Sequence, residues 1–166
     1  MKNDIRVTYP LWMMGFIALL GVIAYGINSP KTEFIDTATE TSLTVQIGPF
    51  ESALIFGAIF VYLIVLTIFV SKVKQYNKNN PQQKISMFSI RPPEYLEADE
   101  GMTYITRRAV QKVYTFYSLA LPALATVVII LPIPRLLIIY AILGLAFTQY
   151  GIYYAEIRKH FKEEKE

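Results

Sequence analysis

The chain has 166 residues, of which 54% are hydrophobic and 17% are charged, and its formal net charge at pH 7 is +3. This composition is more apolar than that of an ordinary soluble domain and indicates an integral membrane protein. The sequence has no cysteine, which excludes disulfides, thiolate metal sites and thiol catalysis, and one histidine, which excludes sites built from several imidazoles.

Four apolar segments approach or reach the length of about 20 residues that a helix needs to cross the hydrocarbon core. They cover residues 11–27, 50–70, 113–131 and 136–154. We expect helices because lipid offers no hydrogen-bond partner to backbone amides. The first segment follows Lys2 and Arg6 but exceeds the apolar core of a usual signal peptide and lacks an obvious cleavage site, so we interpret it as a retained span. The predicted fold is an all-α integral membrane protein with four transmembrane helices in one domain.

The segment between the first two spans, residues 28–49, is predicted to be an external loop. It carries Glu33, Asp36 and Glu40 against a single lysine, Lys31. Residues 42–47 alternate polar and apolar side chains, a pattern that indicates either a short strand or a surface flap.

The segment between the second and third spans, residues 71–112, is the longest polar part of the chain. Near its end, Met102, Ile105, Ala109 and Val113 recur at spacings of three and four residues. This pattern predicts an amphipathic cytoplasmic helix that lies at the membrane interface and runs into the third span.

Charged side chains of this loop are candidate contacts for anionic lipid headgroups or for a protein partner. They are Lys72, Lys74, Arg91, Glu97, Asp99, Glu100, Arg107 and Arg108. The acidic members suggest a divalent-cation site as an alternative, but the spacing of an EF-hand is absent, so we predict no metal site. The basic residues flank apolar segments and do not interleave with exposed aromatics, so we predict no nucleic-acid partner.

Basic residues also predict the orientation, because short cytoplasmic loops retain lysine and arginine. They lie before the first span, between the second and third spans, and in the tail of residues 155–166, whereas the opposite side has only Lys31 and Arg135. We therefore predict that both termini are cytoplasmic in a multi-pass protein of the plasma membrane, the inner membrane in a bacterium.

Spans three and four are joined by a very short connection that contains Pro132 and Pro134. The two helices must therefore be antiparallel neighbours. Pro122 should kink the third span, either as a structural feature or as a gating hinge.

Small residues recur on the faces of the predicted spans and would allow helices to approach closely. The candidate helix-packing positions are Gly15, Ala18 and Gly26 in the first span, Gly57 in the second, and Gly144, Thr148 and Gly151 in the fourth. The sequence leaves open whether they form an internal seam or an oligomer contact. The polar residues Thr67, Ser118, Thr126, Thr148 and Gln149 are expected to form interhelical hydrogen bonds, with the lining of a hydrophilic path as the alternative.

No catalytic motif, phosphate-binding glycine loop or membrane-buried carboxylate is recognisable in the sequence. We therefore predict a non-enzymatic protein without catalytic residues or cofactors, which acts as an accessory, regulatory or immunity-type partner of another membrane protein or associates with itself. The alternatives are an oligomeric pore or small transporter and a holin-like permeabilising protein, to which the charged tail points.

Overall fold

The computed structural model describes residues 5–28, 32–36, 41–45, 48–81, 84–85 and 100–163. Its elements are α1 (Ile5–Ile27), β1 (Thr32–Asp36), β2 (Thr41–Val45), α2 (Pro49–Asn79), α3 (Glu100–Ile130) and α4 (Arg135–Glu163). Within these residues, all four helices are long and apolar enough to cross a membrane. The prediction of an all-α membrane protein with four transmembrane helices is confirmed.

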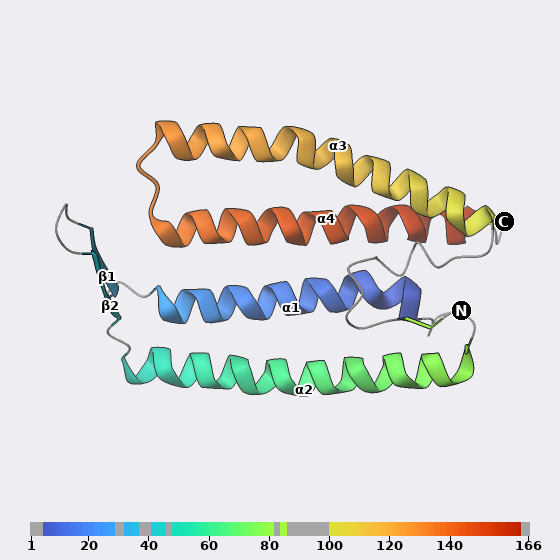
Figure 1. Ribbon diagram of the computed structural model, residues 1–166, viewed down its shortest axis with the longest axis horizontal. Coiled ribbons are helices and arrows are strands. Elements are labelled where there is room, and N and C mark those ends of the chain that lie inside the picture. The colour runs from blue at the N-terminus through green and yellow to red at the C-terminus, as the bar shows by residue number, and fades with distance from the viewer. Residues whose placement is uncertain are drawn as a thin grey trace.

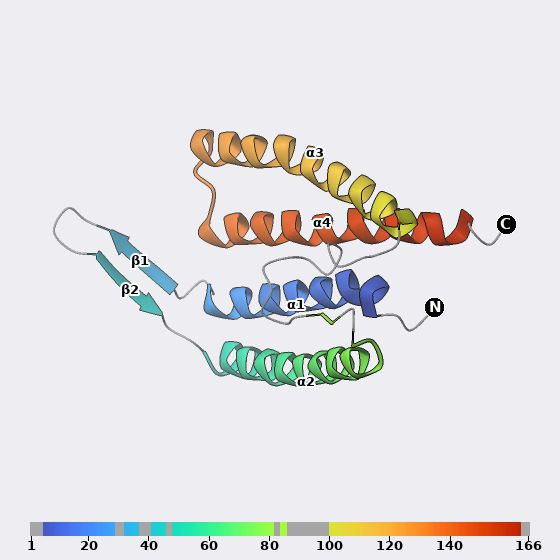
Figure 2. The same ribbon diagram turned by 45° about the vertical axis from the view of Figure 1, so that its right-hand side comes forward.

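The helices lie side by side in a row, in the order α3, α4, α1, α2, in both views (Figures 1 and 2). Helix α1 contacts α2 and α4, and α4 also contacts α3. Each of these neighbouring pairs is antiparallel (Figure 1). Helices α3 and α4 are therefore the antiparallel neighbours that their short connection predicts, whereas α2 and α3 form the two edges of the row.

The two ends of the row differ. Helix α1 begins and α4 ends at one end, which we call the terminal end, together with the end of α2 and the start of α3 (Figure 1). At the opposite end, strands β1 and β2 pair antiparallel, with Phe34 opposite Leu43, and extend beyond the helices (Figure 2). Of the two alternatives for residues 42–47, a short strand or a surface flap, the structure shows the strand in β2, and residues 46–47 lie outside the described residues.

The helices extend past the predicted spans, because polar residues can continue a helix beyond the hydrocarbon core. Helix α2 starts with Pro49 in its first turn and ends at Asn79, not at residue 70. Pro81 follows shortly, and a proline disfavours the helical conformation of the residue before it. The backbone N–H of the C-cap residue Asn80 donates to the carbonyl of Tyr76 at 2.9 Å.

Helices α1 and α2 share an aromatic core near the terminal end. Phe69 is the centre of this core, with its ring centroid 5.9 Å from that of Tyr9, 5.7 Å from Trp12 and 5.8 Å from Phe16. Such tilted and edge-on arrangements are the favoured geometries for aromatic pairs. They fix the register between α1 and α2.

The amphipathic helix predicted before the third span is continuous with that span in α3. Its apolar residues Ile105 and Ala109 are buried against Tyr153 and Ile157 of α4. The expectation that this helix lies along the membrane interface is therefore wrong, because α4 continues to Glu163 and offers a protein surface to the apolar stripe.

Candidate functional site

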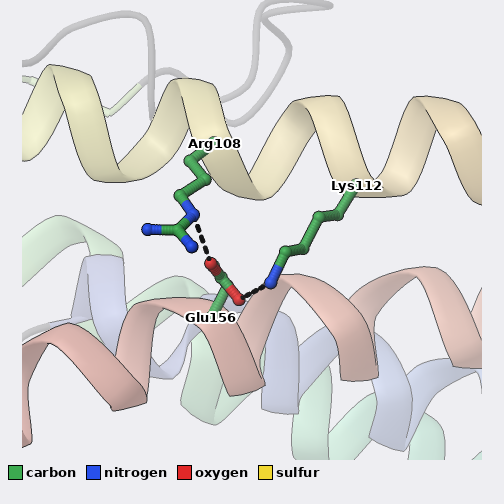
Figure 3. A network of polar contacts seen from close by, with 3 residues as sticks. All are labelled: Arg108, Lys112 and Glu156. Atoms are coloured by element: carbon green, nitrogen blue, oxygen red, sulfur yellow. Dashed lines mark hydrogen bonds and ion pairs between the residues drawn. The ribbon is translucent and has the colours of Figure 1, made fainter.

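The most buried charge in the described part of the chain is the carboxylate of Glu156, whose side chain is 7% exposed. Arg108 Nε lies 3.1 Å from one carboxylate oxygen, and Lys112 Nζ lies 2.5 Å from the other. Both cations come from α3, one turn apart, and reach down to the same carboxylate on α4 (Figure 3). The network therefore joins α3 to α4 at the terminal end of the row.

Glu156 was not predicted as a site residue, because residues 155–166 were interpreted as a cytoplasmic tail. A signal for this contact was present. Glu156 lies between Tyr153 and Ile157, which are buried, and the spacing of Arg108 and Lys112 places both cations on one side of a helix. Arg108, a predicted lipid or partner contact, is thus engaged within the chain, whereas Arg107 is exposed.

A second polar contact joins the same two helices within the membrane-spanning region. The hydroxyl of Tyr117 donates to Oε1 of Gln149 at 2.7 Å. This confirms the interhelical hydrogen bond that was predicted for Gln149. It also engages the most polar side chain of the fourth span.

The hydroxyls of the other predicted polar positions bond to their own helices. Each donates to the carbonyl four residues earlier: Thr67 to Leu63, Ser118 to Tyr114, Thr126 to Pro122 and Thr148 to Gly144. The prediction of interhelical hydrogen bonds is therefore wrong for these four residues. In lipid, the carbonyl of the preceding turn is the nearest available acceptor for a short hydroxyl side chain.

An apolar groove of about 480 Å³ runs along the seam between α1 and α4. Ala18, Gly21 and Val22 of α1, and Leu143, Gly144 and Phe147 of α4, contribute to its walls, and Leu54 of α2 also reaches it. The hydroxyl of Tyr140 crosses the seam and donates to the carbonyl of Gly21 at 3.1 Å. Ala18 and Gly144, two predicted helix-packing positions, are thereby brought together.

Four of the predicted helix-packing glycines face open space within the chain. A Cβ atom built on Gly15, Gly57, Gly144 or Gly151 would meet no atom within 4 Å. At Gly26 a Cβ would overlap Ile55, so the predicted close packing is confirmed there, and at Gly21 a Cβ would lie 3.5 Å from Tyr140. The role of the four open glycines in packing stays a prediction, and it applies to contacts outside this chain.

The remaining predicted contact residues are dispersed. Lys72 places its ammonium 5.5 Å from the centre of the Trp12 ring, whereas Lys74 is exposed on α2. Glu100 begins α3. Arg91, Glu97 and Asp99 lie outside the described residues. In the described ranges, no group of three His, Cys, Asp or Glu side chains could hold a metal ion.

Comparison with protein families, curated proteins and solved structures finds no match to this chain.

Proposed function

We propose that this chain is a non-enzymatic accessory or regulatory subunit that binds a transmembrane helix of another membrane protein in the α1–α4 groove. The open glycine at the groove, Gly144, supports this proposal. Gly144 lines the groove and has space above its Cα, and Ala18 faces it from α1. Helix association in lipid depends on close backbone approach, which small residues permit.

The one-layer arrangement of the helices gives a partner access to this groove. The groove lies at the central seam of the row, and among the described helices none lies over that seam in either view (Figures 1 and 2). Tyr25 and Phe147 border the groove and are 44% and 41% exposed, so aromatic side chains are available at its rim. A helix that presents small residues to this seam would replace lipid contacts by tighter protein contacts.

Site-specific photocrosslinking in cells tests the proposal. A photoreactive residue at Gly144 or Ala18 should capture one defined second protein. The matched controls are Ile142 and Leu20, which lie two residues away, on the other side of the same helices, and are 54% and 43% exposed. Equal capture from groove and control positions, or self-crosslinks alone, would contradict a specific partner in the groove.

The alternative function is an oligomeric pore or small transporter, and a holin-like protein is the third candidate. In a pore, Thr148 and Gln149 would line a path between several copies of the chain. Solute flux across liposomes that is abolished by Thr148→Leu with Gln149→Leu would favour the pore, and growth arrest on expression would favour the holin-like protein. Within the described chain, both side chains already have hydrogen-bond partners, which favours the accessory subunit.

A further inference from the structure

A polar pocket of about 420 Å³ lies where the start of α1 meets the end of α2. Ile5 contributes an apolar wall and is 4% exposed. The other lining residues are polar: Thr8, Lys72, Gln75, Tyr76, Asn79 and Asn80. The α2 residues recur at spacings of three and four, so one face of the helix supplies a row of hydrogen-bonding groups. The volume falls in the usual range for small-ligand pockets, about 300–1,000 Å³.

The pocket lies at the depth of the lipid headgroups. Lys72 follows the apolar segment of α2 almost directly, and its ammonium is 5.5 Å from the centre of the Trp12 ring. Tryptophan is enriched at the boundary between hydrocarbon and water. A ligand in the pocket can therefore be a lipid that remains in the bilayer.

The charge of the lining selects an anion. Lys72 is the charged residue among the side chains that line the pocket, and none of these side chains is a carboxylate. In the part of the chain that the structure describes, no carboxylate forms an ion pair with Lys72. An ammonium that is free of a carboxylate partner binds phosphate oxygens as a charged hydrogen-bond donor. A divalent cation would lack anionic oxygen ligands here.

The side-chain amides in the pocket lining are suited to bind hydroxyl groups of a ligand next to its anionic group. Gln75 and Asn79 are exposed and form no hydrogen bond within the described chain. Asn80 uses its amide nitrogen to donate to the Tyr76 carbonyl at 3.1 Å, so its side-chain oxygen stays available as an acceptor. An amide can both donate and accept, which suits a hydroxyl group.

We propose that this pocket binds the headgroup of an anionic phospholipid that carries hydroxyl groups, such as phosphatidylglycerol. The phosphodiester contacts the Lys72 ammonium, and the headgroup hydroxyls bond to Gln75 and Asn79. The acyl chains continue into the bilayer beside α1 and α2. This site is separate from the α1–α4 groove and does not depend on the proposed partner.

The single tryptophan of the chain allows a direct test. Full-length protein in neutral detergent micelles is titrated with phosphatidylglycerol, and Trp12 fluorescence is recorded, with native mass spectrometry to count bound lipids. A saturable change with one bound lipid is expected, and phosphatidylcholine should bind more weakly because it carries no net charge. Inorganic phosphate and glycerol phosphate are titrated in parallel. Saturation by either one in the same concentration range would assign the pocket to a soluble phosphate and overturn the lipid proposal.

Variants separate this pocket from general attraction to basic residues. Lys72→Gln should weaken phosphatidylglycerol binding about tenfold, the effect of losing one charge-assisted hydrogen bond. Lys74→Gln is the matched control, because Lys74 is exposed on α2 outside the pocket lining, and it should bind as the unmodified protein does. Gln75→Leu with Asn79→Leu leaves the contact between Lys72 and Trp12 in place and should also weaken binding. Equal losses for Lys72→Gln and Lys74→Gln, or full binding by the double variant, would overturn the proposal.

Discussion

At the scale of single residues, we expect the carboxylate of Glu156 to make the largest single contribution to the position of α3 against α4. It is buried and paired with Arg108 and Lys112, whose side chains are 46% and 49% exposed. Glu156→Gln removes the charge at constant shape, and we expect a loss of about 1–3 kcal/mol in the free energy of unfolding. The loss should fall toward the lower end of that range, because the half-exposed side chains of Arg108 and Lys112 can be solvated by water once Glu156 has lost its charge. Unfolding in SDS titrations, followed by circular dichroism, measures it.

Arg107→Gln is the control for this variant. Arg107 neighbours Arg108 in the sequence, is exposed, and forms no ion pair within the described residues. Its replacement should change the free energy of unfolding by less than about 0.5 kcal/mol. An equal loss for Glu156→Gln and Arg107→Gln would mean that the ion-pair network makes no specific contribution to the free energy of unfolding.

The bond between Tyr117 and Gln149 predicts a measurable coupling between α3 and α4. Interhelical hydrogen bonds in membranes contribute on average about 0.6 kcal/mol by double-mutant cycles. We expect a coupling of this size between Tyr117→Phe and Gln149→Leu in the same unfolding assay. The pair Tyr117→Phe and Thr148→Val is the control and should show no coupling, since Thr148 bonds to the Gly144 carbonyl of its own helix.

At the scale of the elements, the packing of α1 on α2 depends on Gly26. A Cβ at this position would overlap Ile55, so Gly26→Ala forces a shift at the contact and should cost about 1–3 kcal/mol. Gly15→Ala is the matched variant on the same helix, and its new methyl group meets no atom within 4 Å. Thermal unfolding in micelles should show a destabilised Gly26→Ala and an unchanged or slightly stabilised Gly15→Ala. The reverse order would contradict the α1–α2 contact.

The same glycines show which structural features a sequence pattern can predict and which it cannot. Hydropathy identified the four spans because a helix in lipid must be long and apolar, and the short connection after residue 131 identified the α3–α4 pair. Hydropathy marks the edge of the hydrocarbon and not the end of a helix, so the extensions of α1, α2 and α4 were not predicted. The extension of α3 was predicted, because the apolar residues before the third span recur at helical spacing. A glycine pattern shows where a close approach is allowed, but the neighbour decides where it occurs. Gly26 has Ile55 opposite it, whereas Gly57 has no neighbour within 4 Å.

At the scale of the whole molecule, the row of helices has two chemically distinct ends. The terminal end contains the Glu156 network, the polar pocket with Lys72, and the lysines near the end of α2. The opposite end contains the β-hairpin and the connection between α3 and α4 (Figure 1). Because all neighbouring helix pairs in the row are antiparallel, one assignment of a compartment orients all four helices (Figure 1). The basic residues at the terminal end predict that this end is cytoplasmic.

Single cysteines can test this orientation, since the natural sequence contains none and needs no background substitutions. Thr44→Cys in β2 should react with a membrane-impermeant maleimide in intact cells. Lys78→Cys, near the end of α2, and Arg158→Cys, near the end of α4, should react only after the membrane is permeabilised. The two residues lie on different helices at the same end of the row, so they must agree for the antiparallel arrangement to hold. Labelling of Lys78→Cys but not of Thr44→Cys in intact cells would invert the predicted orientation, and opposite results for Lys78→Cys and Arg158→Cys would contradict the fold itself.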